Sequence, residues 1–277
     1  MITLPPTAPP LRRDFGWSRN LPVTVAFSWL AAGWADFRNR PGLSLAYGLA
    51  VFVVSIAIVA GLFRIGLDYV LFPALAGFML TGPVIALGLY EKSRRLQRGE
   101  PVGLAAMLFF RPRSGGQVIF TGVLLMLLML LWMRAAVILY ALFFGLLPFS
   151  GFADILPVLV FTPAGWALLI VGTLVGGLFA AFSFAISVFS LPMLLDESTD
   201  SFTAMGTSMA LVWNNLAVMV VWGGIVMVLV TLSLASGLVG LIVAFPVLGH
   251  ATWHAFRTMR QDPAAEIAIE RLDGADS

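Results

Sequence analysis

The stretch that decides the fold is Gln117–Leu147, which reads QVIFTGVLLMLLMLLWMRAAVILYALFFGLL and contains one charged residue, Arg134. An α-helix of about 20 apolar residues is long enough to cross the hydrocarbon core of a bilayer. The whole chain matches this signal, because 60% of its 277 residues are hydrophobic and only 11% are charged. Soluble domains carry roughly 25% charged residues. The chain is therefore expected to lie in a membrane.

Six segments are long and apolar enough to predict an all-α, polytopic fold with six membrane helices. They are Leu43–Phe63, Tyr69–Tyr90, Gln117 to about Ala136, Gly165–Pro192, Leu216–Ala235 and Leu238–Phe256. Residues 25–256 are expected to form the membrane domain. A Pro- and Arg-rich segment, 1–24, precedes it and a charged tail, 257–277, follows it.

The basic residues predict the orientation. All of them except Arg64 and Arg134 lie before the first membrane helix, in the tail, or in the loop after the second helix, where Lys92 is placed. Lys and Arg concentrate on the cytoplasmic side of a bilayer. We therefore expect both termini in the cytoplasm. The acidic segment Asp196–Asp200 fits this pattern less well, since parity also places it in the cytoplasm.

Three shorter segments are expected to lie in the cytoplasmic interface as amphipathic helices. They are Val25–Arg38, Val102–Phe110 and Phe202–Trp213, and each precedes two membrane helices. The second helix of each pair has a proline near its cytoplasmic end, at Pro83, Pro192 and Pro246. This order predicts three repeated units of one interfacial helix and one hairpin. Such repeats occur in transporters, and they also arise by plain duplication of a hairpin.

Arg134 is the first candidate for a functional or structural charge, because arginine is effectively always protonated. Three interpretations stay open. If the third membrane helix ends near Arg134, the side chain anchors the helix at the outer interface by snorkelling. A guanidinium inside the bilayer would instead pair with Asp68 or Asp154, or bind a substrate. The anchor interpretation avoids the cost of burying a charge.

His250 and His254 are four residues apart and therefore share one face of a helix. This spacing suits a metal or haem site. No glutamate follows His250, so a zinc-protease signature is absent, and no third ligand is evident. Packing at the interface, beside Trp253 and Arg257, is the alternative. We expect no bound metal or other cofactor.

Asp196, Glu197 and Asp200 form an acidic cluster that could bind a cation or a basic partner. The alternative is a solvated turn in which Asp200 or Ser201 caps the next helix.

Several classes of activity lack their signature. The chain has no cysteine, and no Ser-His-Asp arrangement is suggested. Its glycine-rich stretches follow no strand, which argues against a nucleotide site. Within the predicted membrane helices no acidic residue lies near the middle, which counts against a proton-coupled pump. We expect no catalytic residues, no enzymatic activity and no nucleic-acid partner.

Local strings of the sequence resemble a bacterial integral-membrane family, domain of unknown function 2189. The strings span residues 29–37, 82–90, 98–101, 132–134, 190–196 and 246–255. The resemblance implies a cytoplasmic-membrane protein and no established activity. Some proteins of this kind are labelled as respiratory oxidase subunit one. A haem–copper core needs about six histidine ligands on several helices, and this chain has only His250 and His254.

The sequence therefore favours a structural protein, or an accessory partner of another membrane assembly such as a respiratory oxidase. The lipid bilayer is its expected surrounding. The alternative is a small-molecule permease with a path between the repeated hairpins. A permease should have a polar cavity at mid-depth, whereas a structural protein should have small-residue packing and a sealed core.

Overall fold

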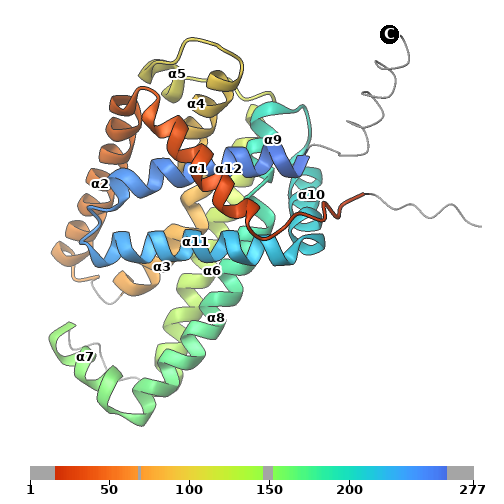
Figure 1. The fold of residues 1–277 in the computed structure, drawn as a ribbon. Helices are drawn as coiled ribbons and strands as arrows, with labels where there is room; N and C mark the ends of the chain where they lie inside the picture. The colour runs from red at the N-terminus through yellow and green to blue at the C-terminus, as the bar shows by residue number, and fades with distance from the viewer. Residues whose placement is uncertain (1–15, 68–69, 146–151, 261–277) are drawn as a thin grey trace, which may run out of the picture.

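The computed structural model describes residues 16–67, 70–145 and 152–260, and within them the fold is entirely helical (Figure 1). The all-α prediction is confirmed. The helices are α1 (Val25–Arg38), α2 (Pro41–Arg64), α3 (Leu71–Ile85), α4 (Leu87–Gln97), α5 (Leu104–Leu108), α6 (Gly115–Phe144), α7 (Phe152–Phe161), α8 (Pro163–Ser187), α9 (Ser190–Asp196), α10 (Ser201–Asn214), α11 (Leu216–Ala235) and α12 (Leu241–Arg260).

Five helical stretches among the described residues are long and apolar enough to cross a membrane. They are Pro41–Arg64, Pro73–Gln97, Gly115–Phe144, Pro163–Asp196 and Leu216–Ala235. The sixth predicted membrane helix, Leu238–Phe256, is present as α12 but is not among the five. Its second half carries His250, His254, Arg257 and Arg260, which lower its hydropathy. A sixth crossing thus stays a prediction.

Proline accompanies the division of two long helices. Pro192 has no N–H, so the carbonyl of Val188 loses its helical partner, and the chain turns between α8 and α9 at this point. The other division, at Ala86 between α3 and α4, follows Pro83 by three residues. The helix predicted to stop at Tyr90 continues as α4 to Gln97, so Lys92 is not in a loop as predicted.

α6 is longer than predicted. It runs to Phe144 rather than to about Ala136, and its 30 residues correspond to about 45 Å of helix. The expectation that this helix ends near Arg134 is therefore wrong. A further helix, α7, lies between the third and fourth predicted membrane helices. The three predicted interfacial segments are all helical, although α5 is shorter than expected.

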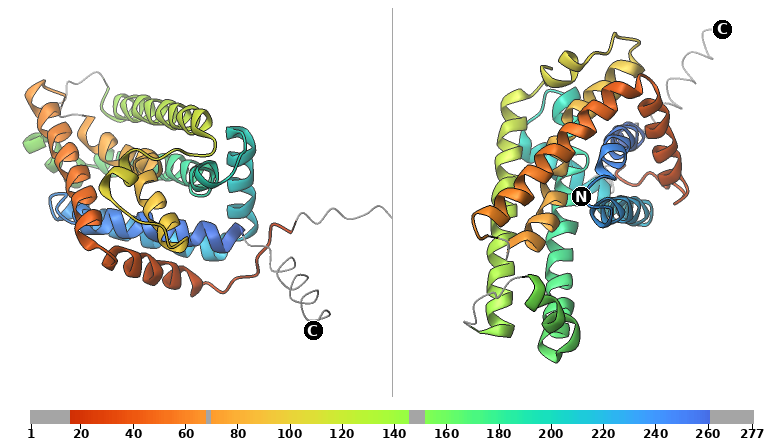
Figure 2. Two further views of the ribbon diagram at one scale, coloured as in Figure 1. Left: turned by 90° about the horizontal axis from the view of Figure 1, so that it is seen from above. Right: turned by 90° about the vertical axis from the view of Figure 1, so that its left-hand side faces the viewer.

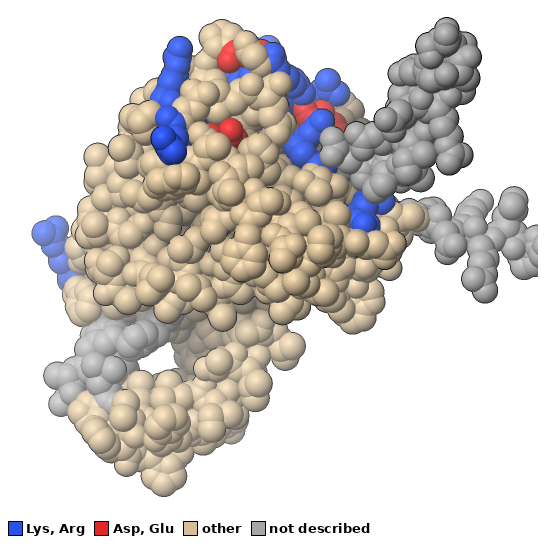
Figure 3. Space-filling model, in the orientation of Figure 1, with Lys and Arg blue, Asp and Glu red and all other residues tan. Residues whose placement is uncertain are grey.

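α12 lies at the centre of the packing, against α1, α2, α4 and α11. It runs across the view of Figure 1 beside α11, whereas α6 and α8 run down it side by side. The right-hand view of Figure 2 shows α11 and α12 nearly end-on and α6 and α8 lengthwise. Most of the charged side chains visible in Figure 3 lie in the upper part of the molecule. No charged side chain of the described residues is visible in the lower part of that face.

Glycines allow α12 to approach its neighbours closely. A Cβ added at Gly33 of α1 would lie 2.6 Å from the backbone nitrogen of Ala251, and one at Gly249 would lie 2.6 Å from a methyl carbon of Leu89. Helices in membranes pack through small residues in this way, because van der Waals contact largely replaces the hydrophobic driving force between them.

Candidate functional site: a buried polar network

The most unusual feature of the core is a buried lysine. Lys92 lies on α4 and has no exposed surface, like Ser44 of α2, Ser93 of α4 and His250 of α12. The Lys92 ammonium donates a hydrogen bond to Ser44 Oγ over 2.8 Å. Ser44 Oγ lies 2.9 Å from His250 Nε2, and Ser93 Oγ lies 2.9 Å from His250 Nδ1. One imidazole therefore joins α2 and α4 to α12.

The chemistry of the donors fixes a consistent direction along this chain. An ammonium only donates, so Ser44 Oγ accepts from Lys92 and can give its own proton to His250 Nε2. A neutral imidazole has one acceptor and one donor nitrogen. His250 Nδ1–H then donates to Ser93. Each of these buried polar groups has a partner, which offsets the cost of removing it from water.

The network continues toward the surface through Asp36 of α1. His254 Nε2 lies 2.8 Å from Asp36 Oδ2, with side-chain exposures of 21% and 16%. Ser93 also hydrogen-bonds to Asp36. Burial favours the neutral carboxyl, but the hydrogen bonds from His254 and Ser93 and the electrostatic interactions with the two histidines outweigh it. They hold the pKa of Asp36 below its ordinary value of 3.8.

Gln97 closes the outer end of this network. Its amide nitrogen lies 3.4 Å from His254 Nδ1, and its carbonyl oxygen accepts from Trp253 Nε1 over 2.9 Å. With Nε2–H directed at Asp36, Nδ1 of His254 is free to accept the amide N–H. Both histidines thus have each ring nitrogen in a polar contact, and these contacts bring α1, α4 and α12 together.

A second group of charges connects α4, α9 and α12. Glu91, which is 1% exposed, forms ion pairs of 2.6 Å with both Arg94 and Arg95. Asp196 at the end of α9 pairs with Arg94, Arg98 and Arg257. The neighbouring Glu197 receives two hydrogen bonds from Arg260, of 2.7 and 2.8 Å. The three elements that carry these charges pack against one another.

The structure places the predicted site residues in different surroundings. Arg134 is exposed in the second half of α6, and it has no ion pair within the described part of the chain. Asp68 lies outside the described residues, and so does the side chain of Asp154. The pairing of Arg134 with either carboxylate thus stays a prediction. Trp132, two residues before Arg134, is buried and donates to the carbonyl of Pro73 over 3.0 Å.

The acidic cluster divides into two parts. Asp200 is the N-cap of α10 and accepts from the backbone N–H of Thr203 over 3.0 Å, as one of the two interpretations predicted. Hydrogen bonds with Thr203 lower the pKa of Asp200. Asp196 is not a solvated turn residue, because three arginines surround it and its side chain is only 12% exposed.

His250 and His254 share a helix face as expected but contact different partners. No group of three His, Cys, Asp or Glu side chains within the described ranges is arranged to hold a metal ion. Nor do the two described hollows offer a polar site, since apolar side chains from several helices line both of them. The polar network can link helices and can change its charge at Asp36 and His254, and neither of the two described hollows is lined by the residues of its buried end.

The sequence does not predict the network residues Ser44, Lys92, Ser93, Glu91 and Asp36 as site residues. A helical signal was present, because Glu91 precedes Arg94 and Arg95 by three and four residues. Carboxylates and bases at these spacings stabilise a helix. That pattern predicts a continued helix after Tyr90 and would have placed Lys92 on it.

Comparison with known proteins agrees with the membrane character of the chain. Residues 71–196 match the family described as "Predicted integral membrane protein (DUF2189)". The resemblance seen in the sequence is confirmed over this range, and the protein is an integral membrane protein with several apolar helices. No curated protein and no solved structure matches the chain.

Proposed function

We propose that the protein is a non-enzymatic membrane protein that acts structurally or as an accessory partner of another membrane assembly. One observation carries this proposal: Ser44, Lys92, Ser93 and His250 are fully enclosed and bonded to one another. A permease needs polar groups that face a path for its substrate. Here the polar groups of the core are used to connect helices.

Close packing of small residues supports the same function. Gly33 and Gly249 allow α12 to contact α1 and α4, and Gly88 brings α4 against Tyr47 of α2. A side chain at any of these positions would force the helices apart. A core closed in this way suits a rigid body that offers its outer surface to a partner.

The packing order also favours three repeated units and a sixth crossing by α12. In this proposal α1, α5 and α10 begin the units. α5 packs on α4 of the first unit, and α10 packs on α8 and α9 of the second. α1 packs on α12 of the third unit and so closes a ring. The three segments that meet in the charged network, α4, α9 and the second half of α12, are equivalent in these units.

The charges support a bacterial inner-membrane location with both termini in the cytoplasm. Arg94, Arg95, Arg98, Arg257 and Arg260 gather around α4, α9 and the end of α12. This end of the molecule would face the cytoplasm, because Lys and Arg concentrate there. The structure thus favours the orientation expected from sequence.

A respiratory oxidase is one assembly that such a protein could accompany. Both ring nitrogens of His250 are already hydrogen-bonded to serines, so this residue offers no free nitrogen to a haem iron. This geometry favours an accessory position beside such a complex over a place in its haem–copper core.

Affinity purification in mild detergent, followed by mass spectrometry, tests the accessory function. The full chain carries the tag, and a second tagged inner-membrane protein expressed to the same level serves as the control. We expect a membrane partner in stoichiometric amount with this chain and not with the control. A solitary protein that produces a solute flux in proteoliposomes would contradict the proposal.

A permease is the second candidate, because the hydrogen bonds form a continuous chain from Lys92 to the partly exposed pair Asp36 and His254. Such a chain could pass protons. Proteoliposomes that contain a pH-sensitive dye, under an imposed potassium diffusion potential, would reveal proton entry. A permease requires a proton flux in the wild type that His250→Gln abolishes. A structural function predicts that vesicles with the wild type and vesicles with His250→Gln both take up protons only at the leak rate of protein-free vesicles.

A further inference from the structure

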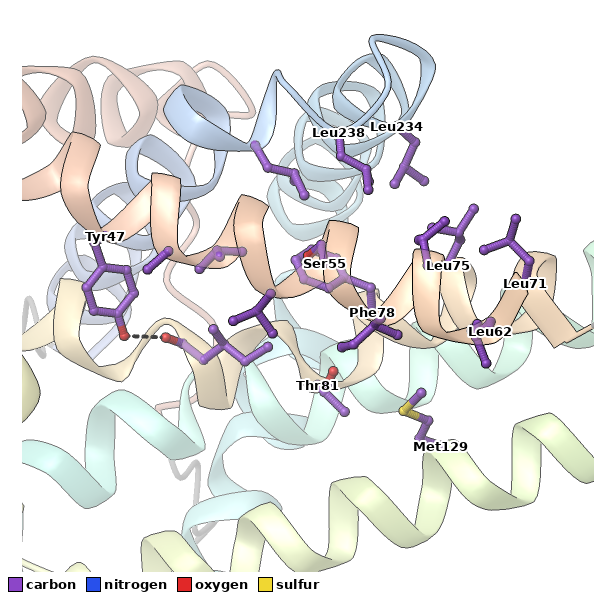
Figure 4. Close-up of a pocket in the computed structure, with 18 of the residues that line it drawn as sticks. Tyr47, Ser55, Leu62, Leu71, Leu75, Phe78, Thr81, Met129, Leu234 and Leu238 are labelled. Atoms are coloured by element: carbon purple, nitrogen blue, oxygen red, sulfur yellow. Dashed lines mark hydrogen bonds between the residues drawn. The ribbon is translucent and has the colours of Figure 1, made fainter. Parts of the chain in front are cut away.

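An apolar groove follows α2, and none of the charged residues of the ion pairs around α4, α9 and α12 lines it. It has a volume of about 500 Å³ and is lined by residues of α2, α3, α5 and α6 and of the α11–α12 hairpin. Figure 4 shows Tyr47 toward one end of the row of side chains, with Leu62 and Leu71 toward the other. Volumes of about 300–1,000 Å³ are typical of sites for small molecules.

The lining determines the chemistry of an occupant. Among the described residues of the wall, only Tyr47, Ser55 and Thr81 bring hydroxyl groups to it. The Tyr47 hydroxyl already donates to the carbonyl of Ile85 over 2.6 Å. A polar ligand would lose its hydrogen bonds to water and regain few of them here. The groove therefore suits a hydrocarbon chain.

The length of the groove fits a lipid that stands upright in the bilayer. From Ala46 to Leu62 it follows about 24 Å of helix, at 1.5 Å per residue. One leaflet contributes about 15 Å to a hydrocarbon core of about 30 Å. An extended acyl chain can lie along α2 within this length.

A cation lies at the α5 end of the groove. Leu104 and Leu108 of α5 line this end, and Arg40 donates to the carbonyl of Val102, two residues before Leu104, over 2.8 Å. The Arg40 side chain is exposed. A guanidinium has five N–H donors and binds phosphate oxygens in pairs. The remaining donors are thus available at the mouth of the groove.

The backbone of Arg40 is an independent observation. Its φ of 54° and ψ of 65° are left-handed, directly before Pro41. This conformation costs an L-residue roughly 1–2 kcal/mol and favours glycine or asparagine. Strained residues of this kind cluster at ligand sites. The left-handed conformation does not favour arginine at this position, whereas a ligand contact of the Arg40 side chain would explain it.

We propose that the groove binds one acyl chain of a glycerophospholipid whose phosphate is held by Arg40. The site is separate from the Lys92–His250 network. Its occupancy would fix α2 against α3 and α5 without any chemical step.

The test uses phosphatidylglycerol with a photoreactive diazirine in one acyl chain, diluted into phosphatidylcholine nanodiscs that contain the full chain. Mass spectrometry maps the adducts. We expect them to concentrate on groove residues such as Phe78 and Met129. An even spread over lipid-facing residues such as Leu127 and Leu131 would overturn the proposal, and this map needs only the wild-type protein.

Two pairs of variants sharpen the test. Ala50→Trp fills the groove, and Ala57→Trp adds the same side chain to α2 outside it. Arg40→Gln and Arg38→Gln each remove one positive charge from the same short stretch. We expect groove adducts to fall at least five-fold in Ala50→Trp and Arg40→Gln and to stay unchanged in the two controls. Equal adducts in Ala50→Trp and Ala57→Trp would contradict the site.

Discussion

The ammonium of Lys92 and the imidazole of His250 are joined through one hydroxyl group, that of Ser44, and none of the three residues is exposed. The contact connects α4, α12 and α2 at their crossing. A buried polar group that loses its partner pays the full cost of its removal from water, about 1–3 kcal/mol. The network thus makes the positions of these helices depend on one another.

Removal of His250 should therefore cost more stability than removal of the lysine charge. His250→Leu removes one hydrogen-bond partner from each of Ser44 and Ser93, which keep Lys92 and Asp36, and we expect a loss of about 1–3 kcal/mol from the two hydrogen bonds. In Lys92→Met the hydroxyls of Ser44 and Ser93 keep their hydrogen bonds to His250, so the expected loss of stability is below about 1 kcal/mol. Thermal unfolding of both variants in one detergent measures the difference. A larger loss for Lys92→Met would contradict the arrangement.

The Asp36–His254 pair predicts a loss of stability in acid. The folded protein holds the pKa of Asp36 below its ordinary value of 3.8. A lowered carboxyl pKa stabilises the fold above the unfolded pKa, and this contribution disappears as the pH falls through the folded pKa. We expect Asp36→Asn to unfold at lower temperature than the wild type at pH 7, and the gap to shrink below pH 4. A constant gap from pH 7 to pH 3 would argue against an ionised Asp36 in this pair.

Asp196 should matter more than its neighbour Glu197. The side chain of Asp196 is 12% exposed and pairs with Arg94, Arg98 and Arg257, whereas that of Glu197 is 29% exposed and pairs with Arg260. Loss of a partly buried carboxylate leaves cations without a partner, and we expect about 2 kcal/mol for Asp196→Asn. An exposed pair contributes less than about 1 kcal/mol, which sets the expectation for Glu197→Gln. Unfolding temperatures in low and high salt check the order, and an equal effect of both variants would contradict it.

Arg134 predicts a defect in assembly. It lies about 29 Å along α6 from Gly115, so it can meet the outer interface if the hydrocarbon core begins near the start of α6. We expect Arg134→Leu to lower the amount of folded protein in membranes more than it changes any transport. Quantitative immunoblotting measures that amount. Normal levels combined with loss of a measurable flux would show a binding charge instead.

Sequence predicts the helices of this protein better than their contacts. The bounds of α1 and α11 follow from apolar stretches that end at turn residues, such as Asn39 after α1 and Ser236 after α11. The burial of Lys92 was missed because charge counting places every lysine next to water. Its partners lie far apart in the chain, since Ser44 and His250 are 206 positions apart, and no local pattern connects them.

The sealed core is tested most directly by its access to water. The chain contains no cysteine, so single substitutions can be labelled without background. Ser44→Cys and Ser93→Cys probe the network in native membranes, and Arg98→Cys, at the exposed residue directly after α4, is the control. The account predicts that a small hydrophilic methanethiosulfonate labels the control rapidly and the two buried positions at least a hundred-fold more slowly. Labelling of Ser44→Cys at the rate of the control, in a variant that keeps its unfolding temperature, would show an open polar path and contradict the structural function.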